Sequence, residues 1–471
     1  VGYAGLYQLE IDRIISNHFS LPNSIPFYGP GGIPAAYPFL SLYIGAFFQH
    51  ILGVPALHYL KYAPALWTLF AFAAAYFFFK EVSKERAKAV TAVLLMALTY
   101  EIFEKHATAA GIVRGPALFF SMLSLIGFWK ITHGKKLSFW VIFGTGLATA
   151  LTAMSHLSYL SFLVITCLAL ILFVREVNLK TRLIRLAETG FICVLFASPW
   201  WGTVLMRYGF ATFLNAFNSH GTLELARVLV SGNVKKVLLS LFEGWGEVPL
   251  IGLTLLGLVY ALVKRNMVTF WWFLFVFLLL GDNARFLILI GALLAADLIL
   301  DVLSVKPAQN HKQEEGQTVL AALGLLLLAG FLWARFFYAI QQYPQALDAD
   351  LVQAANWLKD NSAPEDRYLY FAGDHDTAEW LPWLSQRTPV VGHWGAEWLG
   401  DYALRFSQWE DLSNCADQAS LDCLTSFSSS SGLSYDYILT ENPADGAVDP
   451  FQDAEFEMVY KNDAYCIYQV R

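Results

Sequence analysis

The chain opens with VGYAGLYQLEIDRIISNHFSLPNSIPFYGPGGIPAAYP (residues 1–38), a stretch rich in polar residues, glycine and proline. It carries two acids, Glu10 and Asp12, and it precedes a series of long apolar segments. If those segments cross a membrane, the opening stretch is a loop held against the membrane surface. The interpretation of the whole chain therefore depends on the apolar segments.

The composition favours a polytopic membrane protein. Of the 471 residues, 56% are hydrophobic and only 15% are charged, which is too apolar for a soluble protein of this length. The net charge is −7, and the acids concentrate after Pro344. Nucleic-acid binding is therefore not expected. The sequence contains no phosphate-binding glycine loop, serine-nucleophile elbow or zinc-protease motif.

Apolar segments long enough to cross a bilayer are expected at about ten places. They lie at 59–79, 88–104, 114–132, 138–154, 157–174, 186–205, 246–262, 267–281, 284–303 and 318–340. Loops rich in lysine and arginine alternate with other loops, at 80–88, 130–136, 175–185, 263–266 and 304–312. The positive-inside rule makes the basic loops cytoplasmic, and it puts everything after about residue 341 on the outer face.

Residues 37–53 are apolar but do not fit this alternation, because a span there would move the opening loop to the cytoplasmic side. We therefore expect a helix that lies in the membrane interface, or one that dips in and returns. A second amphipathic helix is expected on the surface at 4–19, and the prolines and glycines of 22–34 argue against regular structure there. Because the chain starts at Val1 and not at methionine, we expect a further span or signal segment ahead of it.

After the last expected span, helix-like segments (348–361 and 376–386) and strand-like segments (367–373, 435–441, 456–462 and 464–470) predict a small α/β domain outside the membrane. The predicted division is thus a first outer loop at 1–58, a transmembrane domain at 59–340 and an extracytoplasmic α/β domain at 341–471. Outside the cytoplasm, Cys415 and Cys423 could close a local disulfide, the alternative being two free thiols.

Acids on the outer face are candidates for a base that deprotonates an acceptor. Glu10 and Asp12 qualify by position, and the alternative is the solvated face of an amphipathic helix. Arg285 lies at the outer end of a span, where an isolated arginine is expected to face a cavity or an anion. A lipid phosphate would suit its guanidinium group, whereas an ion pair with Asp282 is the structural alternative.

Further residues could contact a lipid phosphate. Arg114 with His106 forms a second outer cluster, although helix capping is the commoner use of such residues. Tyr28 in the first loop and His156 at a turn between two spans are weaker candidates, and His156 could equally be an ordinary hydrogen-bonded histidine.

Two more groups combine acids with aromatic or imidazole rings. Glu243 and Glu247 with Trp245 could contact a sugar, although an interfacial tryptophan anchor explains Trp245 equally well. The terminal domain gathers six residues that suggest a metal or sugar contact, or else two capped helix N-termini: Asp374, His375, Asp376, Glu379, His393 and Glu397. No metal site is predicted from them.

Several segments together resemble the GT-C superfamily of membrane glycosyltransferases, which use polyprenyl-phosphate-linked sugars. They are LYQLEIDRII, the proline-started YPFLSLYIGAFF, EKHATAAGIVRGPALFF, ASPWW and the terminal α/β domain. YPFLSLYIGAFF looks like the corresponding helix of the protein mannosyltransferase and aminoarabinose transferase branches. In that superfamily this helix belongs to the first outer loop and is not a full span.

The resemblance implies an integral protein of a bacterial or archaeal plasma membrane that binds membrane lipids and a lipid-linked sugar. It would transfer the sugar to a protein or glycan acceptor outside the cell, with Glu10 or Asp12 as the base and a polyprenyl-phosphate sugar as donor. Two departures count against this. Tyr3 or Ala4 stands where the superfamily has an acid, and VRG (113–115) stands where oligosaccharyltransferases have aspartate, asparagine and glutamate.

A divalent metal cofactor is accordingly not expected. The alternative reading is an inactive protein of this fold that serves as a structural or partner-binding subunit of a membrane assembly.

Overall fold

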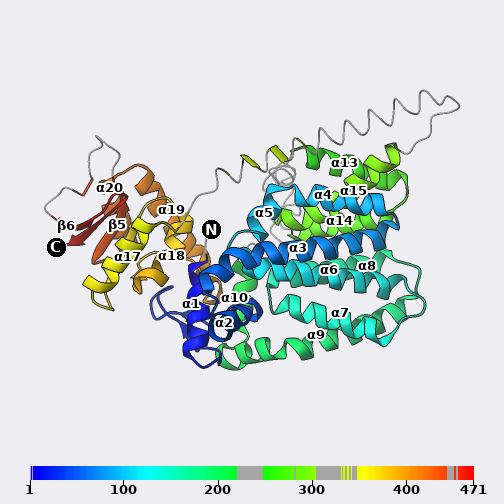
Figure 1. Ribbon diagram of the computed structural model, residues 1–471, viewed down its shortest axis with the longest axis horizontal. Helices are drawn as coiled ribbons and strands as arrows, with labels where there is room; N and C mark the ends of the chain where they lie inside the picture. Colours follow the sequence, from blue (N-terminus) through cyan, green and yellow to red (C-terminus); the bar gives the residue numbers. More distant parts are fainter. Residues whose placement is uncertain are drawn as a thin grey trace. The chain divides into compact units, whose positions relative to one another are not determined.

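The computed structural model describes residues 2, 4–219, 248–280, 283–303, a few positions between 330 and 341, 347–442, 450–451 and 455–471 (Figure 1). The chain divides into two compact units. One comprises Val1–Lys61, Trp201–Gly221 and Pro344–Arg471, and the other comprises Tyr62–Trp200 and Thr222–Tyr343. The opening loop and the terminal domain thus fold together in the first unit.

The second unit is a bundle of helices around an aromatic core. Phe162 and Phe286 stack with ring centroids 4.7 Å apart, and the fully buried Trp272 meets Phe78 edge to face. Figure 1 shows several of its helices side by side. The helices are α3 (Ala56–Ser83), α4 (Arg86–Ala97), α5 (Tyr100–His106), α6 (Gly111–His133), α7 (Phe139–Ala153), α8 (Leu157–Phe173), α9 (Leu179–Tyr208), α13 (Val248–Val263), α14 (Met267–Leu280) and α15 (Ala284–Leu303).

Three of the described helices, α3, α6 and α9, are long and apolar enough to cross a membrane. Several others are apolar but shorter, among them α7, α8 and α14. The segment expected at 88–104 forms two helices, because helical structure is interrupted at Leu98 and Thr99 between α4 and α5. The segment at 318–340 lies largely outside the described residues. The number of spans therefore stays a prediction.

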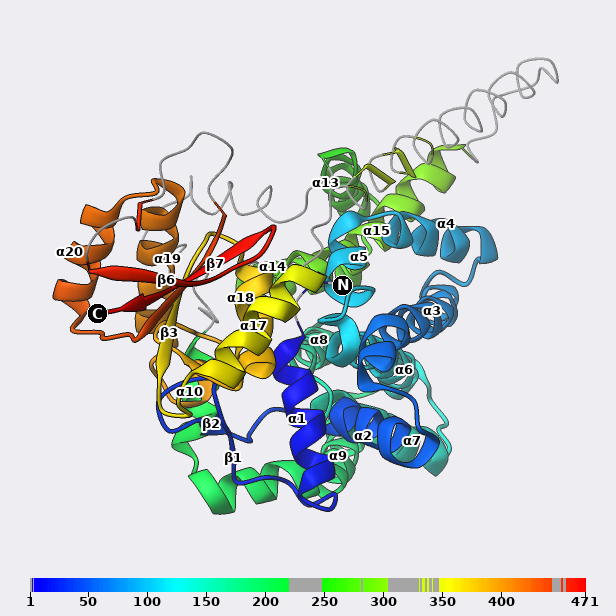
Figure 2. The same cartoon turned by 60° about the vertical axis from the view of Figure 1, so that its left-hand side comes forward.

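In the first unit, helix α1 (Gly5–Ser16) forms where the sequence predicts it, but it is not a surface helix. Figure 2 shows it beside α2 (Leu40–Leu52), and it also packs against α18 (His375–Ser385). Its polar residues Gln8 and Glu10 are each only 4% exposed. The expectation of a surface position was wrong because α1 has contacts on more than one side, which a single amphipathic stripe does not reveal.

Helix α2 has the two faces expected of an interfacial helix. Ser41, Leu42, Gly45 and Ala46 are buried, whereas Phe47, Phe48, Ile51 and Leu52 are exposed. Gly45 permits the close packing, because a Cβ there would lie 2.7 Å from Ile11 Cδ1 of α1. At 13 residues the helix is also too short for a full span.

The proline-rich part of the opening loop contains a small hairpin, which corrects the expectation of no regular structure. Strand β1 (Ser24–Ile25) pairs with β2 (Ile33–Pro34). The end of α9 holds this loop in place. Arg207 Nη1 donates to the carbonyl oxygens of Leu21 and Pro22 at 2.9 and 3.0 Å, and Tyr208 Oη donates to that of Asn23 at 2.5 Å.

The terminal part is an α/β domain with a five-stranded sheet in the order β4-β3-β5-β7-β6. The inner strand β3 (RYLYF) is buried at four successive positions, as expected of a strand with both faces covered. It pairs in parallel with β4 and β5, whereas β7 is antiparallel to both β5 and β6. The strands are β3 (Arg367–Phe371), β4 (Thr388–Pro389), β5 (Tyr437–Glu441), β6 (Phe456–Lys461) and β7 (Tyr465–Val470).

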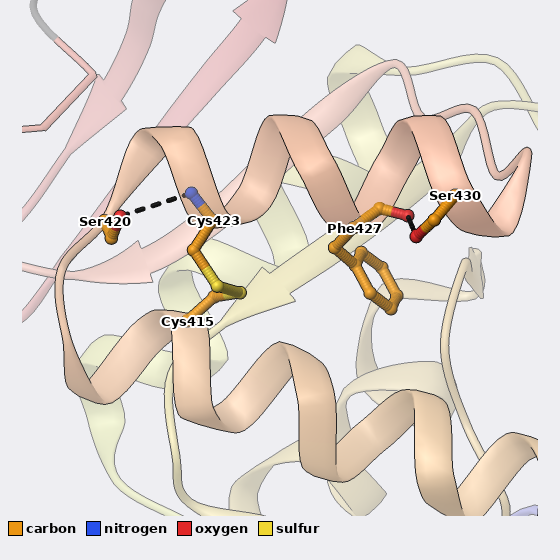
Figure 3. Close-up of a disulfide and its surroundings, with 5 residues drawn as sticks. All are labelled: Cys415, Ser420, Cys423, Phe427 and Ser430. Atoms are coloured by element: carbon orange, nitrogen blue, oxygen red, sulfur yellow. Dashed lines mark hydrogen bonds between the residues drawn. A yellow bond between two sulfur atoms is a disulfide. The ribbon is translucent and has the colours of Figure 1, made fainter.

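Two helices of this domain were not predicted, α19 (Tyr402–Asp417) and α20 (Leu421–Ser431). A disulfide between Cys415 and Cys423 joins them (Figure 3). This is the pairing considered from the sequence. Ser420 caps α20 by accepting a hydrogen bond from the Cys423 backbone N–H at 3.2 Å. The other described helices of this part are α17 (Ala349–Asn361) and the 3₁₀ helix η1 (Ala396–Trp398), and α10 (Ala211–Ser219) follows α9.

Several basic residues of the predicted cytoplasmic loops have structural partners. Arg182 donates to the carbonyl oxygens of Leu170 and Ile171 at the end of α8, and Arg185 donates to that of Gly134 just after α6. Both guanidinium groups thereby satisfy carbonyls at helix ends. Lys88, with 9% of its side chain exposed, forms ion pairs with Asp301 at 2.7 Å and Asp297 at 3.5 Å.

We expect Lys88→Ala to destabilise the helical unit by up to about 3 kcal/mol, because it leaves two partly buried acids without their cation. Lys84→Ala is the matched control, since Lys84 pairs with Glu81 while its side chain is 66% exposed; it should cost less than about 1 kcal/mol. Thermal unfolding of both variants in one detergent measures the difference. Equal melting temperatures would contradict the structural role of Lys88.

Candidate functional site

The first turn of α1 is bound by a carboxylate from the terminal domain. Glu379 of α18 accepts the backbone N–H of Gly5 at 2.5 Å and that of Leu6 at 2.7 Å. An acid at this position is stabilising, because it accepts hydrogen bonds from N–H groups that the helix cannot pair and lies at the positive end of the helix dipole. Gly5 is required here, because a Cβ would lie 2.6 Å from the Glu379 carbonyl oxygen. Tyr28 Oη donates to that same oxygen at 2.7 Å, which gives Tyr28 a structural partner.

Glu10 lies on the buried side of α1. Its Oε2 atom has no hydrogen-bond partner among the residues that the structure describes. Burial, together with the negative charges of Glu397 and Glu379, raises the pKa of Glu10 to about 8. Burial likewise raises the pKa of Glu379 to about 8, against the effect of its two N–H donors, and that of Glu397 to about 7. The charges of Glu379 in α18 and Glu397 in η1 thus both act on Glu10 in α1.

Asp12 has a different environment, although it lies only two residues further along α1. Trp383 Nε1 donates to its Oδ2 at 2.9 Å, and Gln8 Nε2 and Gln49 Nε2 donate to its Oδ1 at 3.1 and 3.3 Å. These donors tie α1 to α18 and α2. The pattern is that of a structural carboxylate, so the geometry favours Glu10 over Asp12 as the proton acceptor.

A basic cluster forms separately in the helical unit. The Arg285 guanidinium lies 5.4 Å from the centre of the Tyr159 ring and 5.0 Å from that of Phe286, and its Nη2 donates to Asn283 Oδ1 at 2.7 Å. Stacking on two rings fixes the direction of the guanidinium group. Asp282, the alternative ion-pair partner, lies outside the described residues.

His106, at the end of α5, belongs to this cluster as a neutral imidazole. Its Nδ1 donates to the Ile102 carbonyl oxygen at 2.8 Å, so its Nε2 accepts a hydrogen bond from the Tyr159 hydroxyl. Burial lowers the pKa of His106 to about 3, and the positive charges of Arg285 and Arg114 act in the same direction. Arg285 and Arg114 are therefore both close enough to His106 for their charges to act on it.

Tyr159 was not predicted as a site residue, although it lies three positions after the candidate His156, and the two rings are 5.6 Å apart. His156 caps α8, since its Nδ1 accepts from the Ser158 backbone N–H at 3.3 Å. This is the ordinary hydrogen-bonded role that was the alternative to binding a lipid phosphate. The acids Glu243 and Glu247, with Trp245, lie outside the described residues.

In the terminal domain, Asp374 caps α18 by accepting from the Asp376 backbone N–H at 3.0 Å. Glu379 and Glu397 belong to the carboxyl cluster, so the six residues grouped by the sequence do not form one centre. Within the described parts of the chain, no group of three or more His, Cys, Asp or Glu side chains could hold a metal ion. His375 and His393 do meet each other.

Because Glu10 is neutral when folded and ionised when unfolded between about pH 4.5 and pH 8, the unfolded state binds fewer protons there. We therefore expect stability to fall as the pH rises through this window. Glu10→Gln should flatten part of the fall, whereas Glu457→Gln, at an exposed position of the same unit, should not. Melting temperatures between pH 5 and pH 8.5 test this, and identical slopes for the two variants would contradict a buried neutral Glu10.

No protein-family model matches the sequence, and no curated protein matches it. Solved structures do match. The Archaeoglobus fulgidus oligosaccharyltransferase, in a complex with Zn and sulfate, aligns over 93% of this chain and 64% of its own, with 15% identity and a TM-score of 0.53. This chain therefore spans less than two thirds of that protein.

ArnT from Cupriavidus metallidurans, bound to undecaprenyl phosphate, aligns over 98% of this chain and 92% of its own, with 12% identity and a TM-score of 0.54. Its apo state aligns over 99% and 93%, with a TM-score of 0.56. At these identities the similarity is one of fold. The chain therefore shares the GT-C fold of these structures.

Proposed function

We propose that this protein transfers a sugar from a polyprenyl-phosphate donor to an acceptor on the extracytoplasmic face of a bacterial or archaeal plasma membrane. The observation that carries the proposal is Glu10, a buried carboxyl group with an unsatisfied oxygen, on the first loop of a GT-C fold. With a pKa of about 8, the ionised form of such a group can take up a proton close to neutral pH, as a catalytic base must.

In the proposed reaction, an acceptor hydroxyl or amide attacks the anomeric carbon of the donor sugar. The bond between that carbon and the phosphate oxygen breaks, and the electron pair leaves with the polyprenyl phosphate. The acceptor proton passes to the ionised Glu10 carboxylate. Glu379 and Glu397 act on Glu10 through their charges, because each of them, when ionised, raises the pKa of the Glu10 carboxyl group.

We assign the phosphate of the carrier lipid to the basic cluster. A guanidinium group can bind a phosphate through two parallel hydrogen bonds, and Arg285 is oriented by the rings of Tyr159 and Phe286. Arg114 contributes a second positive charge near His106. His106 and Tyr159 orient each other, and as a neutral pair they leave the arginines as the cations of the cluster.

A second candidate function is that of a non-catalytic subunit of a membrane assembly. Ala4 precedes α1 at the beginning of the loop, where the resemblance leads one to expect an acid. Burial also keeps Glu10 mostly protonated at pH 7, when it cannot accept a proton. A protein that only binds partners needs no ionised Glu10, so the response of activity to this residue separates the two functions.

We expect transfer of labelled sugar from polyprenyl-phosphate donors by wild-type protein in membranes to rise with pH through about 8, because the base form of Glu10 increases there. Glu10→Gln should lower the rate by about 100-fold or more. Asp12→Asn is the matched control on the same helix and should retain a larger rate. A wild-type rate in Glu10→Gln would exclude Glu10 as the base, and no transfer by the wild type from any such donor would favour the non-catalytic subunit.

Arg285→Gln should weaken the binding of polyprenyl phosphate about tenfold or more, because it removes the charge-assisted pair to the phosphate. Arg265→Gln, in a turn predicted to be cytoplasmic, is the control and should bind as the wild type does. Binding of a fluorescent polyprenyl phosphate to the protein in detergent measures both. Equal affinities for the two variants would remove Arg285 from the phosphate site.

A further inference from the structure

Two histidines of the terminal domain contact each other through their Nε2 atoms. His375 begins α18, His393 lies just before η1, and their Nε2 atoms are 3.0 Å apart. His393 is 3% exposed, whereas 40% of the His375 side chain is exposed. One ring is therefore fixed inside the domain and the other is open to solvent. Neither ring takes part in the proposed sugar transfer.

Aromatic side chains hold the inner imidazole in its orientation. His393 stacks on Trp394 with ring centroids 4.4 Å apart, and the edges of Phe406 and Tyr402 contact it at 5.1 and 5.8 Å. His375 meets Trp394 at 4.9 Å. These ring contacts accompany the approach of the two Nε2 atoms to 3.0 Å.

We propose that His375 and His393 form a binding site for a divalent transition-metal ion of the Zn²⁺ type. Neutral imidazole nitrogen is a preferred ligand for such ions, with Zn–N bonds of about 2.0–2.1 Å. Two bonds of that length at a tetrahedral angle separate their nitrogens by about 3.3 Å. The observed 3.0 Å needs to open by only a few tenths of an ångström.

Two further features fit a metal site. Asp376 Oδ1 lies 3.8 Å from His375 Nδ1, on the side of the ring opposite Nε2. If this carboxylate closes to hydrogen-bond distance when an ion binds, it would orient His375 as outer-shell carboxylates of histidine metal sites do. The exposure of His375 leaves room for water at the remaining coordination positions, which a site with only two protein ligands requires.

The helix-capping explanation does not account for this pair. Asp374 caps α18, whereas the rings of His375 and His393 face each other. A metal ion bound by both Nε2 atoms would link the start of α18 to the segment before η1. This site is independent of the proposed sugar transfer.

The test uses the full chain without a histidine tag, purified in detergent and treated with a chelator. Co²⁺ absorption and Zn²⁺ calorimetry should show one ion per chain and a rise in melting temperature. His375→Gln should lose this binding, and Asp376→Asn should weaken it about tenfold. His18→Gln, at an exposed position of the first loop, is the control and should bind as the wild type does.

Absence of a saturable one-to-one site in the wild type would overturn the proposal without any variant. So would unchanged binding in His375→Gln, which is expected to fold because its side chain is partly exposed. Near-ultraviolet circular dichroism of each variant shows whether it folds. These outcomes leave the test of sugar transfer unaffected, because that test follows Glu10 and labelled donor.

Discussion

The contact between Glu379 and the first turn of α1 determines the arrangement of the candidate catalytic residues. The carboxylate accepts two backbone N–H groups that the helix itself cannot pair, so it fixes where α1 begins. Tyr28 and Trp380 reinforce this position by donating to the Glu379 carbonyl oxygen and to the Gly2 carbonyl oxygen. With its start fixed, α1 buries Glu10 and presents Asp12 to Trp383. Two hydrogen bonds to one carboxyl group thereby help to place two neighbouring acids in different environments.

Much of the fold follows from local sequence patterns. Helical periodicity predicted α1, and alternating apolar runs predicted strands β3, β5, β6 and β7, because these signals depend on residues close together in the chain. The helices α19 and α20 were missed. Their sequences are largely polar and carry no long apolar stripe: the buried residues are Trp409, Leu412 and Cys415 in α19, and Leu424 and Phe427 in α20.

The candidate site was predictable only in part. Glu10, Arg285 and His106 could be named from their positions next to apolar segments. The role of Glu379 could not, because it contacts Gly5 across 374 residues of sequence, and no local pattern records such a contact. The basic loops show a related limit. Arg182 and Arg185 bind helix-end carbonyls, so part of the charge pattern that predicts orientation also has a structural cause.

The same long-range contact bears on how the chain is made. Helix α1 leaves the ribosome early, but α18, which holds its first turn, is synthesised 374 residues later, a delay of about 20 to 75 s at about 5–20 residues per second. Until then Gln8 and Glu10 lack the neighbours that bury them. The opening segment therefore stays partly folded until α18 is made, and during that time the exposed Phe47, Phe48, Ile51 and Leu52 of α2 are the apolar surface it offers to other contacts.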